Sequence, residues 1–262
     1  PLPAMMIGHL LGFPDALWPA LQRWSEETIA LGGGPRYANE AGTTAVFEFV
    51  QACSDLYEEK SKSPSDDIMS TWIEAERNGL RDKADFGLDQ IISDCLLLLD
   101  GGAETTRTVI ARTLLELTKN PEQWDLLKNG ANLDLAVEEF IRFVTPIHNM
   151  CRVATEDYEI GGETIRKGQQ IVLMYSSANR DTSHFDNPER LNIARDPNHH
   201  IAFGFGTHFC LGASLARLEI KLFFEIFLER IASIKLLSDP VEMPNSFVYG
   251  LASCLMQLEK EI

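Results

Sequence analysis

The chain has little of several features that would place it in a special class of protein. Positive charge is scarce, because 23 Lys and Arg stand against 39 Asp and Glu, for a net charge of −16. This acidic balance argues against nucleic acid or an anionic membrane as the main partner. The longest strongly apolar run, Cys95 to Leu99, is too short to span a bilayer. Internal repeats and low-complexity tracts are missing as well.

Paired cysteines and targeting signals are also missing. The five cysteines are scattered and odd in number, which favours a reducing compartment and predicts a cytoplasmic protein. Residues 1–13 are apolar but lack a basic region and a cleavage site, so they predict a core helix, not a signal peptide. The chain begins with Pro1 instead of Met, and we therefore expect it to be a fragment of a longer protein.

Hydrophobic periodicity predicts a mainly α fold with a small β region. The composition, 45% hydrophobic and 24% charged, is that of an ordinary globular protein. We expect a helical body over residues 1–145 and 211–231, and β-rich parts over 150–175 and 234–258. Within these parts, apolar spacing predicts helices over 17–29, 43–59, 88–118, 122–128, 133–144 and 211–231, and strands over 150–154, 158–160 and 170–174.

One cysteine lies in an unusual setting, the segment Phe203-Gly-Phe-Gly-Thr-His-Phe-Cys-Leu-Gly212. Gly204, Gly206 and Gly212 allow the backbone to press against a flat ligand, since no side chain intervenes. Cys210 stands directly before a segment with helical apolar spacing. The positive end of a helix dipole favours the thiolate, which is the form that binds a metal.

Other interpretations of this segment are possible. A lone cysteine is usually an inert, buried small hydrophobe. His208 and Cys210 could belong to a zinc site, but the chain has no Cys-x-x-Cys pair to complete one. A dinucleotide-binding loop fails, because Phe209 stands where the third glycine would be.

The ten-residue pattern resembles the cysteine-ligand signature of the cytochrome P450 family, Phe-Gly-x-Gly-x-His-x-Cys-x-Gly, at every fixed position. The resemblance implies the cytochrome P450 fold and haem b with Cys210 as the axial thiolate, a ligand that favours O–O cleavage. It also implies that Arg152 and His208 bind the haem propionates, although Arg152 could be an ordinary exposed strand residue. The remaining histidines of the second half have no such support and are expected in loops or on the surface: His148, His184, His199 and His200.

The long helix contains two adjacent glycines, Gly101 and Gly102, each of which costs roughly 1 kcal/mol relative to alanine. They indicate either close packing of helices or a local opening of the helix over a bound cofactor. Thr105 can donate a hydrogen bond to the carbonyl of Gly101 and bend the helix. The family's Gly-x-Asp/Glu-Thr pattern matches here, which implies that Glu104 and Thr105 are the acid–alcohol pair that delivers protons to the reacting oxygen.

Glu139 and Arg142 are three residues apart on one predicted helix face. Such a pair is usually solvated, but the apolar neighbours indicate partial burial. The pair resembles the family's Glu-x-x-Arg motif, and Arg190 in Pro-Glu-Arg resembles its third member. The resemblance implies a buried structural network of these three residues.

The resemblance also indicates a substrate pocket of mostly apolar or small residues, which suits a lipophilic substrate. The same residues could instead be ordinary core. They are Leu97, Leu98, Gly101 and Gly102 on the long helix, Ile147, His148, Asn149 and Met150 before Arg152, and Val248, Tyr249 and Gly250 in the tail.

We expect a single cytochrome P450 domain over 1–262, the C-terminal two-thirds of such an enzyme. Family members have an N-terminal portion that this sequence lacks, and without it one wall of the haem pocket is missing. The resemblance implies a monooxygenase acting on a sterol, a steroid or a fatty-acid-like molecule, most similar to actinobacterial sterol and steroid side-chain hydroxylases. It also implies a ferredoxin-type or other electron donor. The alternatives are a haem-binding fragment without turnover and a helical interaction module without haem.

Overall fold

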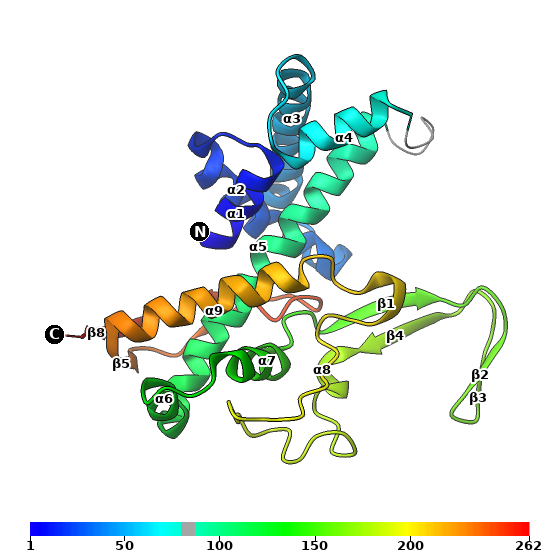
Figure 1. Ribbon diagram of the computed structural model, residues 1–262. Helices are drawn as coiled ribbons and strands as arrows, with labels where there is room; N and C mark the ends of the chain where they lie inside the picture. The colour runs from blue at the N-terminus through cyan, green and yellow to red at the C-terminus, as the bar shows by residue number, and fades with distance from the viewer. Residues whose placement is uncertain (80–86, 262) are drawn as a thin grey trace. The chain divides into compact units, whose positions relative to one another are not determined.

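The computed structural model describes residues 1–79 and 87–261. The predicted helical body includes residues 80–86, which lie outside the described ranges. The chain divides into two compact units, Pro1–Arg107 (unit 1) and Thr108–Ile262 (unit 2), which are described separately. The helix α5 (Leu88–Lys119) continues from one unit into the other and is drawn in green-cyan in Figure 1. Within the described ranges, no helix combines the length and apolar character that a membrane crossing needs.

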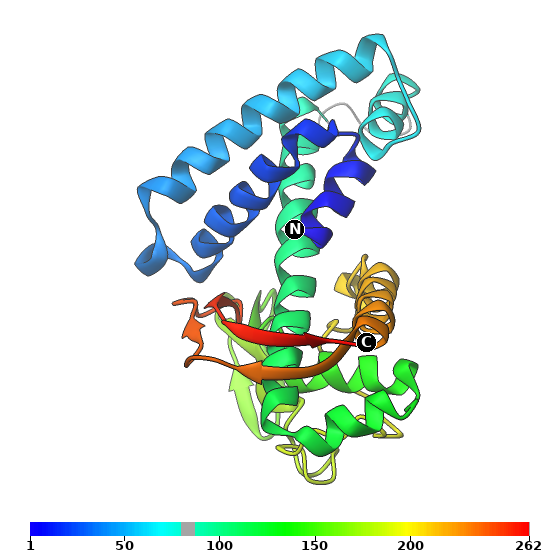
Figure 2. The same ribbon diagram turned by 90° about the vertical axis from the view of Figure 1, so that its left-hand side faces the viewer.

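Unit 1 is helical, as the sequence predicts. In Figure 2, α2 and α3 lie side by side, and their contact is among the most extensive between helices. Ring packing of Trp24 against Phe49, at 5.8 Å between centroids, joins these two helices. The elements before α5 are α1 (Leu2–Leu11), 3-10 helices at Asp15–Leu17, Ile29–Gly33 and Pro35–Tyr37, α2 (Trp18–Thr28), α3 (Glu40–Lys62) and α4 (Ile68–Arg77).

Unit 2 begins with the second part of α5 and adds three longer helices, α6 (Pro121–Lys128), α7 (Leu133–Val144) and α9 (Ala213–Arg230). The fully buried rings of Phe140 on α7 and Phe224 on α9 pack at 4.8 Å between centroids. Apolar side chains of α5, α6 and α7 join them in one core, together with Leu191 and Ile193 from the loop that follows the strands. This core holds α7 and α9 together, and both helices contain charged residues of the site described below.

The β region of unit 2 consists of two-stranded antiparallel pairs. Figure 1 shows β1 beside β4 and, beyond them, the hairpin of β2 and β3. β3 and the short helix α8 (Tyr175–Ala178) were not among the sequence-based expectations. The strands are β1 (Asn149–Val153), β2 (Tyr158–Ile160), β3 (Glu163–Ile165), β4 (Gln170–Met174), β5 (Ile231–Leu236), β6 (Val241–Glu242), β7 (Leu251–Ser253) and β8 (Met256–Lys260).

Candidate functional site

The segment around Cys210 is a tight loop that leads into α9. Its Cys210 N–H donates to the carbonyl oxygen of Phe203 at 3.0 Å, which closes the loop. Gly204 and Gly206 adopt φ values of 72° and 76°, a left-handed conformation that favours glycine. No atom lies within 4 Å of where a Cβ at Gly206 or Gly212 would be, so the backbone is open at both positions.

The thiol of Cys210 is half-buried, and its neighbours shift its pKa in opposite directions. Burial raises the pKa of Cys210, while the N–H of Gly212 and the charge of Arg217 lower it, and burial prevails. The predicted stabilisation of the thiolate by the helix N-terminus is therefore present but outweighed. The correction concerns the free thiol, because a metal deprotonates a thiol that coordinates it.

Large apolar side chains around Cys210 are exposed in unit 2. Phe205 and Leu211 are 89% and 90% exposed, and Phe209 is 50% exposed. Apolar surface of this extent beside a thiol and an open glycine backbone fits a flat apolar ligand such as haem. Among the described residues, no three His, Cys, Asp or Glu side chains form a metal-binding group, so His208 and Cys210 lack the partners of a zinc site.

A charged cluster missed by the sequence analysis holds this loop against α7. Glu138 accepts hydrogen bonds from Arg217 Nε at 2.5 Å and Nη2 at 2.9 Å, and lies 3.0 Å from His200 Nε2. Burial would raise the pKa of Glu138, but the bonds from His200 and Arg217 outweigh it and lower the pKa to about 2. His200 lies in a loop, which is one of the two expected positions, but its side chain is only 2% exposed and therefore not on the surface. The Arg217 guanidinium also lies 4.5 Å from the ring centroid of Phe203.

Arg152 and His208 both lie in unit 2. Arg152 is on β1, where its Nη1 donates to the carbonyl of Cys151 at 2.9 Å, and no ion pair among the described residues includes it. His208 is exposed in the 3-10 turn Gly206–His208 of the cysteine loop. Both side chains can therefore take an anionic partner, and their role in binding propionates stays a prediction.

In unit 1, the two glycines of α5 differ in their surroundings. A Cβ at Gly102 would lie 2.4 Å from Ile7 Cδ1, whereas a Cβ at Gly101 would meet no atom within 4 Å. Thr105 Oγ1 donates to the carbonyl of Gly101 at 2.6 Å, as the sequence predicts. The helix nevertheless remains α-helical through both glycines, so the expected local opening is corrected. The extra hydrogen bond is accepted without breaking the helix.

Glu104, also on α5, is buried and is 2% exposed. It accepts hydrogen bonds from Arg107 Nη2 at 2.5 Å and Nε at 3.2 Å, and Ser25 Oγ of α2 lies at 3.5 Å. Burial raises the pKa of Glu104, and Arg107 offsets this only in part. A carboxyl in such surroundings keeps its proton to a higher pH than an exposed glutamate does.

Glu139 is the centre of a second buried network in unit 2. Two guanidinium nitrogens of Arg142 donate to Glu139, Nε at 2.7 Å and Nη2 at 2.8 Å. Both side chains are fully buried. The same carboxylate accepts Asn192 N at 2.9 Å, Arg195 Nε at 3.0 Å and Asn198 Nδ2 at 3.1 Å. The expected buried pair is thus present, and the carboxylate is shared between two guanidinium groups.

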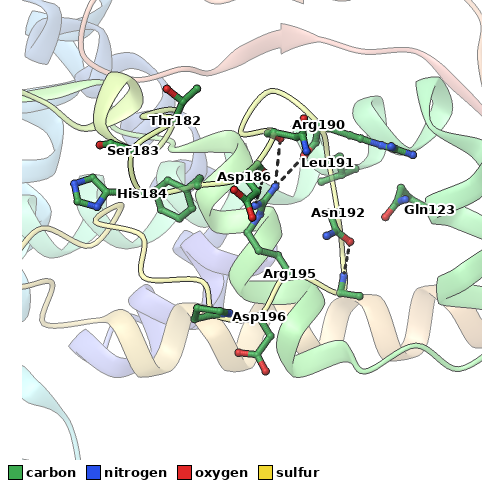
Figure 3. Close-up of a pocket in the computed structure, with 14 residues that line it drawn as sticks. Gln123, Thr182, Ser183, His184, Asp186, Arg190, Leu191, Asn192, Arg195 and Asp196 are labelled. Atoms are coloured by element: carbon green, nitrogen blue, oxygen red, sulfur yellow. Dashed lines mark hydrogen bonds between the residues drawn. The ribbon is translucent and has the colours of Figure 1, made fainter.

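The second guanidinium belongs to Arg195, not to Arg190, so that prediction is corrected. Arg190 is exposed, and its contribution is a main-chain carbonyl that accepts from Arg195 Nη2 at 3.4 Å. Figure 3 shows the Arg190 side chain extending away from Arg195 beside a surface pocket lined by residues 182–187, 190–192 and 194–197 and by Gln123. The main chain turns at 186–192, and this turn brings Arg195 to the carboxylate.

Two of the predicted substrate segments are adjacent in unit 2. Ile147 and Val248 form an antiparallel bridge, and the rings of His148 and Tyr249 lie 4.9 Å apart between centroids. Burial lowers the pKa of His148, and the charge of nearby Arg112 lowers it further, so both favour the neutral imidazole.

The other members of the predicted pocket are placed as follows. Asn149 donates to the carbonyl of Ser246 at 3.0 Å, and Met150 is 37% exposed. Leu97, on the part of α5 in unit 1, is 69% exposed, and Leu98 is partly buried. An exposed leucine at this position is not ordinary core, which favours the pocket interpretation for Leu97.

Arg112 is a buried residue that the sequence analysis did not single out. Its guanidinium bonds the carbonyl oxygens of Tyr249 and Gly250 and pairs with Glu242, and it is 4% exposed. It thereby holds the tail segment against α5. An arginine within an apolar helical pattern is a signal that could have been used, but its partners more than a hundred residues away could not be inferred.

Comparisons with known proteins agree with these features. Residues 123–247 match the family model described as Cytochrome P450. A steroid C26-monooxygenase from Mycolicibacterium smegmatis is 38% identical over 259 residues, covering 95% of this chain and 63% of that protein. A steroid C26-monooxygenase from Mycobacterium tuberculosis is 35% identical, covering 97% and 68%. The structure of CYP109E1 from Bacillus megaterium in complex with testosterone has a TM-score of 0.85 at 31% identity, covering 100% and 71%. The chain thus spans 63% of the length of the first of these relatives.

Proposed function

The chain belongs to the cytochrome P450 family, and we propose that it is the haem-binding part of a monooxygenase. The reaction converts a substrate C–H bond, O2, two electrons and two protons into C–OH and water. Haem b is the cofactor of this family, and when bound it supplies the activation of dioxygen. The protein supplies the ligand, the proton donors and the pocket.

One observation carries the proposal: the half-buried Cys210 thiol lies in a glycine loop bordered by exposed apolar side chains. Cys210 would be the thiolate ligand of the haem iron, and Phe203, Gly204, Gly206 and Gly212 would hold the haem beside it. The cluster of Glu138, Arg217 and His200 would hold this loop in place without touching the reacting atoms. We assign Arg152 and His208 to the propionates.

Proton delivery is assigned to Glu104 and Thr105, and Gly101 is assigned to the cofactor; the same expectation for Gly102 is corrected, because its Cβ position is filled by Ile7. Thr105 is fixed by its bond to the Gly101 carbonyl, and this fixes where its hydroxyl oxygen can accept a proton. Burial raises the pKa of Glu104, which makes its carboxyl a weaker acid than an exposed glutamate and suits a group that passes protons.

The substrate proposed is lipophilic, a steroid or a molecule of similar character. Two relatives are named steroid C26-monooxygenases, and the structure of CYP109E1 contains testosterone. Support in this chain comes from the exposed Leu97, the segment 147–150 and the tail at 248–250. Electrons would come from a ferredoxin-type or other donor. Because the cysteines of the described ranges are free, we place the reaction in the cytoplasm.

A second candidate is a haem-binding fragment without turnover. This candidate concerns the chain of 262 residues alone, which spans 63% of the length of a steroid C26-monooxygenase from Mycolicibacterium smegmatis. Steady oxidation of NADH or NADPH with a redox partner and a steroid, accompanied by hydroxylated product, would distinguish the enzyme from the fragment.

The test of haem ligation is a difference spectrum of the reduced, haem-supplied chain under carbon monoxide. We expect the strongly red-shifted Soret band of a thiolate ligand. Cys210→Ser should abolish this band, whereas Cys151→Ser, a change at an exposed cysteine on β1, should leave it unchanged. A folded chain that takes up haem but lacks the band would contradict the proposal.

A further inference from the structure

Asp100 lies on α5 one helical turn before Glu104, and neither the cysteine loop nor the acid–alcohol pattern gives it a role. Its side chain contacts α2, where Thr28 Oγ1 lies 2.6 Å from Asp100 Oδ1. Thr28 itself is buried at 3% exposure. The same hydroxyl lies 2.7 Å from the main-chain carbonyl oxygen of Trp24. Asp100, Thr28 and Trp24 therefore form a short chain of three oxygen atoms.

Only one arrangement of protons satisfies this chain. A threonine hydroxyl has a single proton, and a carbonyl oxygen cannot donate. If Thr28 donated to an ionised Asp100, its oxygen would face the Trp24 carbonyl at 2.7 Å without a proton between them, which is repulsive. If Asp100 is protonated, it donates to Thr28 and Thr28 donates to Trp24, so both short contacts become hydrogen bonds.

The charges around Asp100 favour the same state. Burial raises the pKa of Asp100 to about 7, the bond from Thr28 lowers it in part, and the charge of Glu104 raises it again. Glu104 is paired with Arg107, and Arg107 also lies 3.3 Å from Glu26 on α2. The further charged groups of α2, Arg23 and Glu27, are paired with each other. The 3-10 helix Ile29–Gly33 that follows α2 contains no ionisable side chain.

We propose that Asp100 is a neutral carboxylic acid near neutral pH that donates its proton to Thr28, and that it is a positioning residue for Glu104. Two buried carboxylates one turn apart repel each other. A neutral Asp100 leaves the single negative charge on Glu104, where Arg107 balances it. This inference rests on the proposed function in one respect, the assignment of Glu104 as a proton donor.

The first experiment measures urea unfolding of the chain and of Asp100→Asn from pH 4 to pH 8. The amide is neutral at every pH and can still donate to Thr28, so it reproduces the protonated state. Below an ordinary aspartate pKa, Asp100 is protonated in both the folded and the unfolded chain. As the pH rises, the unfolded state ionises first. The wild-type unfolding constant should therefore increase relative to the variant by about tenfold per pH unit, and become constant above about pH 7.

Asp157→Asn is the matched control. A bond from the N–H of Lys167 and one from Arg166 lower the pKa of the exposed Asp157. The wild type therefore gains stability relative to this variant, the opposite sign, only as the pH rises toward about 4, and the two curves should run parallel over most of the range from pH 4 to pH 8. Parallel pH curves for Asp100→Asn and the wild type would overturn the proposal.

A second measurement does not depend on the stability of the Asn variant. Infrared spectra of the chain labelled with carbon-13 at the aspartate carboxyl should show a protonated C=O band that disappears near pH 7. Thr28→Val removes the acceptor and should shift this band to higher frequency. Failure to observe any protonated aspartate band at pH 6 would also overturn the proposal.

The positioning role has its own readout. With the glutamate carboxyls labelled, Glu104 should titrate at the same pH in Asp100→Asn as in the wild type, because the amide reproduces the neutral acid. A Glu104 titration that moves to lower pH in Asp100→Asn would show that Asp100 is charged while Glu104 ionises, and would overturn the positioning role. Neither measurement requires bound haem or turnover, so a missing carbon monoxide band would contradict the proposed function and leave the result for Asp100 standing.

Discussion

The sharpest prediction of the structure concerns which arginine shares Glu139 with Arg142. The perturbation is a pair of variants, Arg195→Ala and Arg190→Ala. Each removes one arginine side chain, and the two positions are five residues apart. Arg195 is 8% exposed and bonds the fully buried Glu139, whereas the Arg190 side chain is exposed and lies outside the network. We expect a large loss of stability from the first variant and almost none from the second.

The magnitude follows from the contacts that are lost. Arg195→Ala removes the Nε donor at 3.0 Å from Glu139 and the Nη1 donor at 2.9 Å from the Asp186 carbonyl. Removing one partner of a buried ion pair costs about 3–5 kcal/mol. Glu139 keeps both bonds from Arg142, so the cost should be at the lower end, about 3 kcal/mol in the free energy of unfolding. Arg190→Ala should cost less than about 0.5 kcal/mol, as is usual for a surface change.

The assay is equilibrium unfolding in urea, followed by fluorescence and circular dichroism, with equal slopes required of all variants. Arg195→Lys is a useful third variant, since a lysine has one ammonium group and can replace the Glu139 contact but not the fork of donors to the main chain. It should recover only part of the loss. Equal losses from Arg195→Ala and Arg190→Ala would refute this arrangement of the network.

Two further predictions concern single positions on helices, Glu219 on α9 and the glycine pair on α5. Burial raises the pKa of Glu219 to about 7, and its Oε1 has no hydrogen-bond partner among the described residues. Since the unfolded chain ionises at lower pH, stability should fall between about pH 4.5 and pH 7, and Glu219→Gln should be up to about 3 kcal/mol more stable at pH 8 and equal at pH 4 in urea unfolding. On α5, Gly101→Ala should be neutral or stabilising by up to about 1 kcal/mol, because nothing lies within 4 Å. Gly102→Ala should lower the melting temperature, because its Cβ would lie 2.4 Å from Ile7 Cδ1, and a melting temperature above that of Gly101→Ala would contradict this packing.

Where local signals are strong, the sequence predicts the elements with the observed bounds. The helix expected over 133–144 is α7, and it begins after Asn132, whose side chain accepts a bond from Asp134 N at 2.9 Å. It ends directly before Thr145 and Pro146. The strands expected over 158–160 and 170–174 are β2 and β4. Caps, prolines and turn glycines act within a few residues, so sequence alone can locate them.

The two glycines of α5 show why one pattern can allow two interpretations. Close packing and a local opening of the helix were the alternatives for the pair, yet the structure has close packing at Gly102 alone and a continuous helix at both. Gly102 meets Ile7 of α1, and Gly101 meets nothing. Adjacent helical residues point about 100° apart, so neighbours in sequence face different surroundings. The sequence could predict that a glycine is needed for close packing, but only the position of α1 shows that this glycine is Gly102.

The charged networks mark the limit of prediction from sequence, and the reason is distance along the chain. Glu139 and Arg142 are three residues apart on one helix and were predicted as a pair. Arg195 reaches the same carboxylate across 56 residues, and Arg217 reaches Glu138 across 79. Such contacts depend on how loops turn between packed elements, and a shift of one turn exchanges one arginine for another. A motif therefore predicts that a buried carboxylate needs a second guanidinium, while the fold decides which residue provides it.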